Sequence, residues 1–291
     1  MALGRQAFAL LAAELRGRGV RRLLVPAFAC QTMVTPWQFE GYEVERVPVG
    51  PDLLMDAGLL ARRLAHQPRA TVVLHCETFG NTASARLAEV LARARADGAA
   101  LAVDRTHSFL AAPATACDHE VVSTRKLLDL PELAWVTGTS RPPAPRGPVD
   151  LRLSQARRAS LGRGDEGLDE WVEDLADEAW APVCPDGAAL SRWRRTDLAA
   201  RAARVLATRR RVLARVPDLD VVNPTAVAPL VVRRRDADEV LDRLHDRGVV
   251  GPIHWDRPRH LPGPWPDDLV CLPSQPDPRQ LDAIAEVLRP G

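Results

Sequence analysis

Short apolar runs alternate with amphipathic stretches along this chain, and that alternation constrains the fold more than any other feature. Residues 70–75 form a run rich in β-branched residues, typical of a strand that is buried on both faces of a sheet, and residues 100–104 are predicted as the next buried strand. Between them, residues 82–96 have the apolar spacing of an amphipathic helix, which ends at Asp97-Gly98. Strands and helices joined by short connections favour the α/β class, with a mostly parallel sheet sandwiched by helices.

The same patterns extend over the rest of the chain. Further strands are predicted at residues 23–25, 44–49, 121–123 and 134–136. Further helices are predicted at residues 4–19, 31–40, 57–67 and 168–180. A long arginine-rich helical pattern then covers residues 190–216, followed by strands at 229–233 and 269–272 and helices at 236–247 and 278–288. We therefore expect a large domain over residues 1–186, and a long helix with a small C-terminal α/β domain over residues 187–291.

Composition and charge exclude several classes of protein. The 39 basic and 38 acidic residues give a net charge of +1, so nothing draws the whole chain toward nucleic acid. No apolar run approaches the roughly 20 residues that cross a bilayer, so we expect no membrane span. The five cysteines have no C-x-x-C spacing, which argues against a disulfide framework or a zinc site; no metal is expected, and a reducing cytoplasm fits best.

Lys126 is the only lysine in the chain, so 38 of the 39 basic residues are arginine. A position that keeps lysine in such a chain should need a property that arginine lacks. A lysine amine can lose its proton and form a Schiff base, whereas a guanidinium stays protonated. The alternative is one surface lysine that survived by chance.

Side chains with useful chemistry follow the predicted strands. His75, Asp104 and Lys126 lie at or just after strand ends, and ligands gather at the carboxyl edge of a parallel sheet. Gly4-Arg5-Gln6-Ala7 opens the first helix, where unpaired N–H groups and the positive end of the helix dipole suit a phosphate. A phosphate cradle, a carboxylate and a nucleophilic lysine are together what pyridoxal 5'-phosphate (PLP) requires.

Five segments occur in an order that resembles a known family. They are Gly4-Arg5-Gln6-Ala7, Pro26-Ala27-Phe28 with the helix after it, Val103-Asp104-Arg105-Thr106-His107, Val122-Ser123-Thr124-Arg125-Lys126, and Ile253-His254-Trp255. Together they resemble the DegT/DnrJ/EryC1/StrS branch of fold-type I, aspartate-aminotransferase-like PLP-dependent enzymes, over nearly the whole chain. The resemblance implies the PLP-dependent transferase fold.

The resemblance also implies roles for individual residues. Lys126 would form the Schiff base with PLP, Asp104 would pair with the pyridine nitrogen, and His107 would contact the phenolic oxygen. The ring-stacking residue would be Trp37, although a gapless alignment from Pro26 places Val34 nearer to that position.

The phosphate would be bound at the start of the first helix and at the end of the strand predicted at residues 121–123. Gly4, Arg5 and Gln6 would offer backbone N–H groups, and Ser123 would offer its hydroxyl. Structural alternatives stay open: Asp104 could cap a turn, His107 could be a structural histidine, and Ser123 could bond local backbone.

The implied activity is transfer of an amino group in specialised biosynthesis. The resemblance implies a small-molecule amino donor such as glutamate, a keto-sugar nucleotide or related small ketone as acceptor, and a homodimer with a shared active site. A PLP-dependent lyase, aldolase or cyclising enzyme would need the same residues. A cofactor-free binding subunit of the same fold is the other alternative, because the sequence departs from the family pattern in three ways. The family's usual glycine pair is replaced by Pro131-Glu132-Leu133-Ala134. The usual N-terminal arm before the cradle is short, and the usual asparagine segment is not recognisable.

Overall fold

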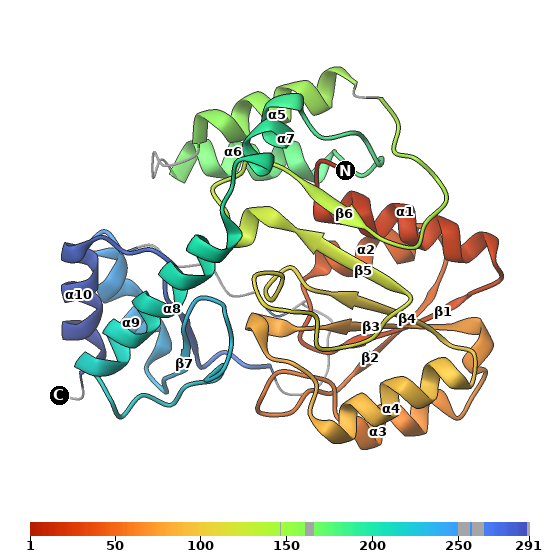
Figure 1. Ribbon diagram of the computed structural model, residues 1–291, viewed down its shortest axis with the longest axis horizontal. Helices are drawn as coiled ribbons and strands as arrows, with labels where there is room; N and C mark the ends of the chain where they lie inside the picture. Colours follow the sequence, from red (N-terminus) through yellow and green to blue (C-terminus); the bar gives the residue numbers. More distant parts are fainter. Residues whose placement is uncertain (146, 161–165, 250–256, 258–264, 290–291) are drawn as a thin grey trace.

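A six-stranded sheet lies at the centre of the molecule, with strand order β2-β1-β3-β4-β5-β6 (Figure 1). The first five strands are parallel, and β6 runs antiparallel to β5. The strands are β1 (Arg22–Pro26), β2 (Glu43–Val47), β3 (Thr71–Cys76), β4 (Ala100–Asp104), β5 (His119–Ser123) and β6 (Ala134–Val136). The computed structural model describes residues 1–145, 147–160, 166–249, 257 and 265–289. The predicted α/β class with a mostly parallel sheet is confirmed.

Helices cover both faces of this sheet (Figure 1). One face is covered by α1 (Gly4–Gly17) and α2 (Gln31–Phe39), and the other by α3 (Ala57–Leu64) and α4 (Ala85–Ala96). Both layers arise from apolar residues spaced three or four apart, which form one stripe on each helix. Leu11 and Leu15 of α1 are buried on the first face, and Leu87 and Leu91 of α4 on the second. Short 3₁₀ turns connect several elements: η1 (Pro68–Ala70), η2 (Thr78–Gly80) and η3 (Thr124–Lys126).

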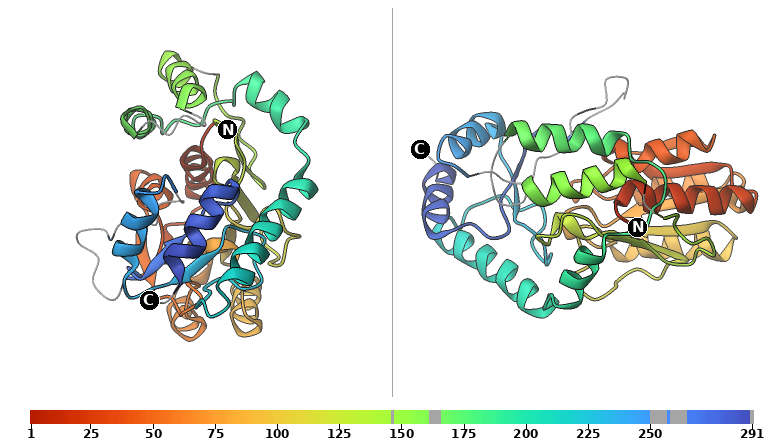
Figure 2. Two further views of the ribbon diagram at one scale, coloured as in Figure 1. Left: turned by 90° about the vertical axis from the view of Figure 1, so that its left-hand side faces the viewer. Right: turned by 90° about the horizontal axis from the view of Figure 1, so that it is seen from above.

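Two helices, α5 (Pro148–Ser160) and α6 (Glu166–Asp177), pack side by side next to the start of α1 (Figure 2). Leu153 of α5 and Leu175 of α6 share a buried cluster with Leu3, the residue before α1. The sequence patterns predicted α6 but not α5. The proline-rich stretch before α5 indicates a loop, yet Pro148 occupies the first helical position, where its missing N–H removes no helix hydrogen bond.

The expected long helix over residues 190–216 is wrong, because two helices occupy that region. These are α7 (Gly187–Arg194) and α8 (Leu198–Arg215). The break between them is explained by Asp197, which precedes α8 and whose Oδ1 accepts a hydrogen bond from the backbone N–H of Ala200 at 2.9 Å. An aspartate that caps a helix start in this way favours a new helix over continuation of the previous one.

The C-terminal part of the chain forms a second, smaller sheet. The strands β7 (Val231–Arg233) and β8 (Leu269–Cys271) are antiparallel, and α9 (Ala237–His245) and α10 (Pro278–Leu288) pack with α8 around their core. Phe28 and Phe79 of the large sheet's loops share a buried cluster with this small sheet. Ile253-His254-Trp255, one of the motifs named above, lies outside the described residues. Within the described ranges, no helix combines the length and apolar composition needed to cross a membrane.

Candidate active site

A cavity of about 460 Å³ opens at the carboxyl edge of the large sheet. This volume falls within the range of small-molecule sites, about 300–1,000 Å³. Six of the eight residues predicted as site residues line the cavity: Gly4, Arg5, Asp104, His107, Ser123 and Lys126. They come from the start of α1 and from the ends of β4 and β5, as expected for neighbouring parallel strands whose carboxyl ends share an edge.

Asp104 ends β4 and is buried, with 8% of its surface exposed. Its Oδ1 accepts a hydrogen bond from the backbone N–H of Thr106 at 2.8 Å. Burial raises the pKa of Asp104 to about 6, although the hydrogen bonds from Thr106 work in the opposite direction. No arginine or lysine of the described residues forms an ion pair with it, so this carboxylate could receive a cationic group of a ligand.

Lys126 ends the short turn η3 directly after β5, and its side chain is accessible to solvent through the cavity. The Arg125 cation, and then burial, lower the pKa of the Lys126 amine from 10.5 to about 8. The backbone after Lys126 is held by Arg201 of α8, whose Nε donates to the Leu127 carbonyl oxygen at 2.7 Å. The amine is therefore placed on a fixed turn and is partly in its nucleophilic, uncharged form near neutral pH.

The start of α1 approaches the end of β5 very closely. A Cβ atom added to Gly4 would lie 3.0 Å from the Cβ of Ser123, closer than side chains normally pack. The N–H groups of a helix's first turn have no acceptor inside the helix, so this side of the cavity could bind an anion. Thr106 joins the two strand ends, because its Oγ1 accepts from the backbone N–H of Ser123 at 3.0 Å.

The side chains of Arg5 and Gln6 bind other parts of the protein. Arg5 donates to the Ala176 carbonyl oxygen at 2.7 Å and pairs with Asp177 at 2.6 Å. Gln6 does not line the cavity; it is fully buried, and its amide bonds the backbone of Leu3 at 3.2 Å and of Ala179 at 3.3 Å. Gln6 could therefore contribute only its backbone N–H, whereas Arg5 also brings a cation, paired with Asp177, to the cavity wall.

His107 follows Asp104 by three residues. Its ring stacks on that of Phe79, with ring centroids 5.4 Å apart. Its Nδ1 accepts a hydrogen bond from the backbone N–H of Phe79 at 3.1 Å, which places the proton of the neutral ring on Nε2. Burial, and then the Lys126 cation, lower the pKa of His107 to about 3. The ring is therefore neutral at physiological pH.

The structure does not bring Trp37 to the cavity. Its side chain is fully buried in the core between α2 and the sheet, and its ring meets Tyr42 edge-on at 5.0 Å. Val34, the alternative for the same role, is also buried in that core. The reason is the orientation of α2, which directs these two residues toward the sheet. Residues nearer the start of α2 line the cavity instead: Cys30, Thr32 and Met33.

His75 is likewise absent from the cavity. It is fully buried within β3, and neither ring nitrogen has a hydrogen-bond partner among the described residues. Burial lowers its pKa to about 4, so the ring is neutral. The next residue, Cys76, faces the opposite side of the strand and lines the cavity, so the expected grouping at this edge holds for Asp104 and Lys126 but not for His75.

Several cavity residues were not predicted from the sequence. Arg157 of α5 and Glu173 of α6 form part of the wall, and so do Glu77 and Thr78 after β3. Glu77 and Thr78 follow a strand end, which is a signal that could have found them. Arg157 and Glu173 carry no comparable signal, because they reach the cavity only through the packing of α5 and α6 against α1.

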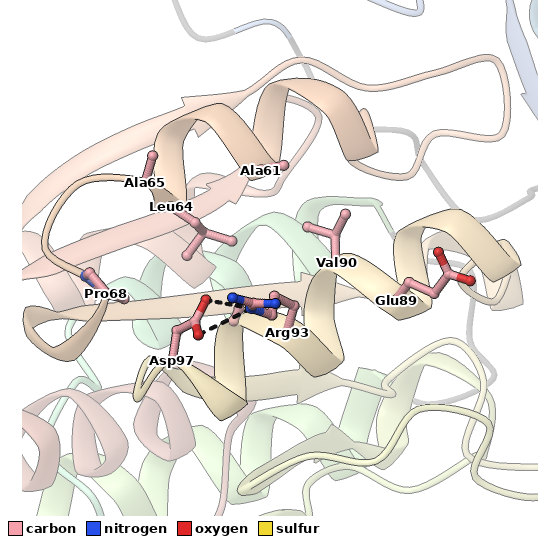
Figure 3. A pocket seen from close by; sticks show the side chains of 9 residues that line it. Ala61, Leu64, Ala65, Pro68, Glu89, Val90, Arg93 and Asp97 are labelled. Carbon is pink, nitrogen blue, oxygen red and sulfur yellow. Dashed lines mark hydrogen bonds and ion pairs between the residues drawn. The ribbon is translucent and has the colours of Figure 1, made fainter.

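A second cavity lies between α3 and α4 on the far side of the sheet (Figure 3). It is lined mainly by apolar side chains and by the Arg93–Asp97 ion pair, a contact of 3.0 Å within α4. It contains none of the predicted site residues. In the part of the chain that the structure describes, no group of three or more histidine, cysteine or acidic side chains is arranged to hold a metal ion.

Solved structures resemble this chain over nearly its whole length, whereas no family model and no curated protein matches it. Sugar aminotransferase CalS13 from Micromonospora echinospora is 18% identical, with a TM-score of 0.69 over 99% of this chain and 85% of that one. A DegT DnrJ EryC1 StrS aminotransferase from Brucella abortus is 17% identical, with a TM-score of 0.67 over 98% and 83%. The PMP-form of putative sugar aminotransferase Spr1654 from Streptococcus pneumoniae is 15% identical, with a TM-score of 0.69 over 98% and 85%. The predicted resemblance is thus confirmed at the level of the fold.

Proposed function

We propose that this protein is a PLP-dependent aminotransferase. The observation that carries the proposal is the shared position of three groups: the only lysine amine, a buried carboxylate and the first turn of a helix all line one cavity. The solved structures of the same fold include a sugar aminotransferase and a protein in a PMP-form, which supports this reading.

The residues present fit PLP. Lys126 offers a partly uncharged amine, and Asp104 is a buried carboxylate with no cation paired to it in the described chain. Gly4 leaves room between α1 and Ser123 that a Cβ atom would fill. Lys126 would hold the cofactor covalently, Asp104 would bind the pyridine nitrogen, and Ser123 with the first-turn N–H groups would bind the phosphate.

When bound, PLP supplies an aldehyde that condenses with amines and a ring that accepts electrons released at a substrate carbon. The protein's own groups would then move protons. The Lys126 Nζ would be the base that takes the proton from the donor carbon bearing the nitrogen. Because its pKa is lowered, this amine is uncharged more often near pH 7 than an ordinary lysine.

Asp104 and His107 would orient the cofactor. An ionised Asp104 keeps a proton on the pyridine nitrogen, since each negative charge held close favours the protonated ring. The Nε2–H of His107 would donate a hydrogen bond to the phenolic oxygen, and the stacked Phe79 and its backbone N–H fix the imidazole in that tautomer.

The proposal extends to substrates, assembly and location. The acceptor we propose is a keto-sugar nucleotide or a related small ketone, and the donor is an amino acid such as glutamate. We also propose a homodimer with a shared active site, a cytoplasmic location, and a cofactor-binding domain over residues 1–186 followed by the smaller domain over residues 187–291. Phe39 and Trp171, which are 67% and 48% exposed, are candidates for the dimer surface.

The test is a half-reaction followed by absorbance. Protein loaded with PLP is mixed with an amino donor and no acceptor. Amino transfer predicts loss of the visible band and growth of a band at shorter wavelength, which a keto acceptor then reverses. A band that returns without acceptor would indicate a lyase, aldolase or cyclising enzyme, and a protein that stays colourless with PLP would indicate a cofactor-free binding subunit; either result contradicts the proposal.

A further inference from the structure

Arg157 is a buried cation, and some of its hydrogen-bond donors have no acceptor among the described residues. Only 5% of its surface is exposed, and its side chain lines the same cavity as Lys126. Its Nε and Nη2 atoms are buried and have no hydrogen-bond acceptor within the described part of the chain. Buried guanidinium donors without acceptors cost free energy, and here they border a cavity from which a ligand could supply the acceptors.

The carboxylate nearest to Arg157 is shared among three cations. Glu173 Oε1 lies 3.6 Å from Arg157 Nη2 and 3.0 Å from Arg125 Nη1, and Glu173 Oε2 lies 3.9 Å from Arg5 Nη2. Arg125 has the hydrogen bond to Glu173, and Arg5 is paired with Asp177. Arg157 is therefore the cation with the weakest partner in this cluster.

Like charges also surround Arg157. Burial, and then Arg125, lower the pKa of Arg157 to about 9, with Arg5 acting in the same direction and Glu173 and Glu132 opposing it. Lys126 has its own pKa lowered partly by Arg125 and Arg157. This wall of the cavity thus carries an excess of positive charge, which an anion would relieve.

The positions of the two unsatisfied atoms, Nε and Nη2, indicate which kind of ligand group could accept their hydrogen bonds. Nε–H and Nη2–H lie on the same edge of a guanidinium, and that edge binds two oxygens of one carboxylate or phosphate in parallel. Glu173 Oε1 is 3.6 Å from Nη2 on this edge, and the Glu173 side chain is 51% exposed. A change of its rotamer would therefore leave the edge free for a ligand. We propose that Arg157 binds an oxyanion of the ligand through this edge, in place of Glu173.

Under the proposed function, on which this inference rests for its ligand, the oxyanion is a carboxylate of the amino donor or a phosphate. The phosphate is that of PLP or that of the keto-sugar nucleotide. The direct test uses two probes that need no cofactor, succinate and inorganic phosphate, with their affinities measured by calorimetry on protein freed of PLP. The variants are Arg157→Gln, Arg157→Lys, Glu173→Gln, and Arg152→Gln, an exposed arginine on the same helix, as the matched control.

We expect Arg157→Gln to weaken binding of at least one probe about 10- to 100-fold, because a charge-assisted bidentate contact is lost. Arg157→Lys should restore only part of it, Glu173→Gln should strengthen it, and Arg152→Gln should leave it unchanged. Thermal unfolding separates this role from a structural one: removal of an unsatisfied buried cation should leave the melting temperature unchanged or raise it.

The source of the oxyanion is then identified with PLP and pyridoxal, which lacks the phosphate. If Arg157→Gln weakens binding of PLP but not of pyridoxal, the oxyanion that Arg157 binds is the phosphate of PLP. If Arg157→Gln leaves binding of both unchanged but weakens binding of succinate, the oxyanion is the donor carboxylate. If it leaves both unchanged but weakens binding of inorganic phosphate, the oxyanion is a phosphate of the sugar nucleotide. Unchanged affinity for succinate, phosphate and PLP would overturn the inference. Failure of the wild-type protein to bind PLP would contradict the proposed function alone, since the probe measurements would still test Arg157.

Discussion

Gly4 and Ser123 lie so close together that a Cβ atom at Gly4 would come within 3.0 Å of the Ser123 Cβ and 3.4 Å of its Oγ. The first turn of α1 and the end of β5 are thereby brought into one anion-binding corner of the cavity. A side chain at position 4 would require Ser123 to shift by a few tenths of an ångström. The absence of a side chain at Gly4 is thus a geometric requirement of the proposed phosphate site.

Gly4→Ala tests this corner. We expect affinity for PLP to fall about 10-fold, because the helix N–H groups and the Ser123 hydroxyl can no longer converge on one phosphate. Affinity for pyridoxal should change little. Gly187→Ala is the matched control, since Gly187 also begins a helix but a Cβ there would meet nothing within 4 Å. Equal PLP affinity in Gly4→Ala and wild type, by absorbance titration, would contradict the assignment.

Asp104→Asn separates a catalytic carboxylate from a turn cap. Asparagine keeps the oxygen that accepts from Thr106 N–H, so the turn should persist. Loss of the charge should lower the rate of amino transfer about 10- to 1,000-fold, the effect of one to three pKa units on the ring nitrogen. A turn cap alone would predict an unchanged rate in steady-state kinetics.

The pKa of Asp104 also predicts how stability depends on pH in the protein without cofactor. Its pKa in the folded protein, about 6, lies above the ordinary value of 3.8, so the folded state binds the proton more tightly. The resulting stabilisation is present below about pH 4 and is lost as the pH rises through about 6. Asp104→Asn should remove this component and be no less stable than wild type at pH 7. Denaturant unfolding across this range measures it, and a destabilised variant at pH 7 would contradict the assignment.

Capture of PLP should depend on pH through Lys126. The uncharged amine is the nucleophile, so the capture rate should rise with pH and reach half its maximum near pH 8. Arg125→Gln removes the largest cause of the lowered pKa and should move this midpoint to higher pH. Arg152→Gln should not. Stopped-flow absorbance gives the profile, and a midpoint near the ordinary value of 10.5 in wild type would show that the amine is not tuned by its surroundings.

Arg201 of α8 is expected to position the lysine without contacting the ligand. Its Nε–H bond to the Leu127 carbonyl oxygen, at 2.7 Å, fixes the turn that carries Lys126. Arg201→Gln should slow PLP capture about 10-fold and lower the free energy of unfolding by about 1–3 kcal/mol, because a buried carbonyl loses its partner. The pH midpoint of capture should not move. Arg204→Gln, on an exposed position of the same helix, is the control.

The parts of the site that could be predicted from the sequence are those set by local structure. Asp104 and Ser123 end apolar strands, and the strand pattern alone places such ends at one edge of a parallel sheet. Lys126 was identified because arginine replaces lysine everywhere else. Gly4 was identified because it opens a helix.

The parts that could not be predicted depend on tertiary packing. Trp37 and Met33 lie four residues apart on one face of α2 and share the same core cluster, but only Met33, one turn nearer the start of the helix, also lines the cavity. The sequence pattern does not show how far along the helix the cavity extends. Arg157 is brought to the cavity by the packing of α5 against α1, which no local pattern indicates. The break at Asp197 was missed because a capping aspartate within an alanine- and arginine-rich stretch leaves the helical periodicity intact.

Chemical trapping of PLP on the protein, followed by peptide mapping, tests most directly whether Lys126 holds the cofactor. Lys126 is the only lysine, so the sole other primary amine is the N-terminus, which bonds the Ala134 carbonyl oxygen at 2.6 Å. After incubation with PLP and reduction with borohydride, the account predicts one phosphopyridoxyl group per chain, on the peptide that contains Lys126. Lys126→Ala should remain folded by circular dichroism and carry none. A chain without the adduct, or with the adduct on the N-terminal amine, would contradict the central claim.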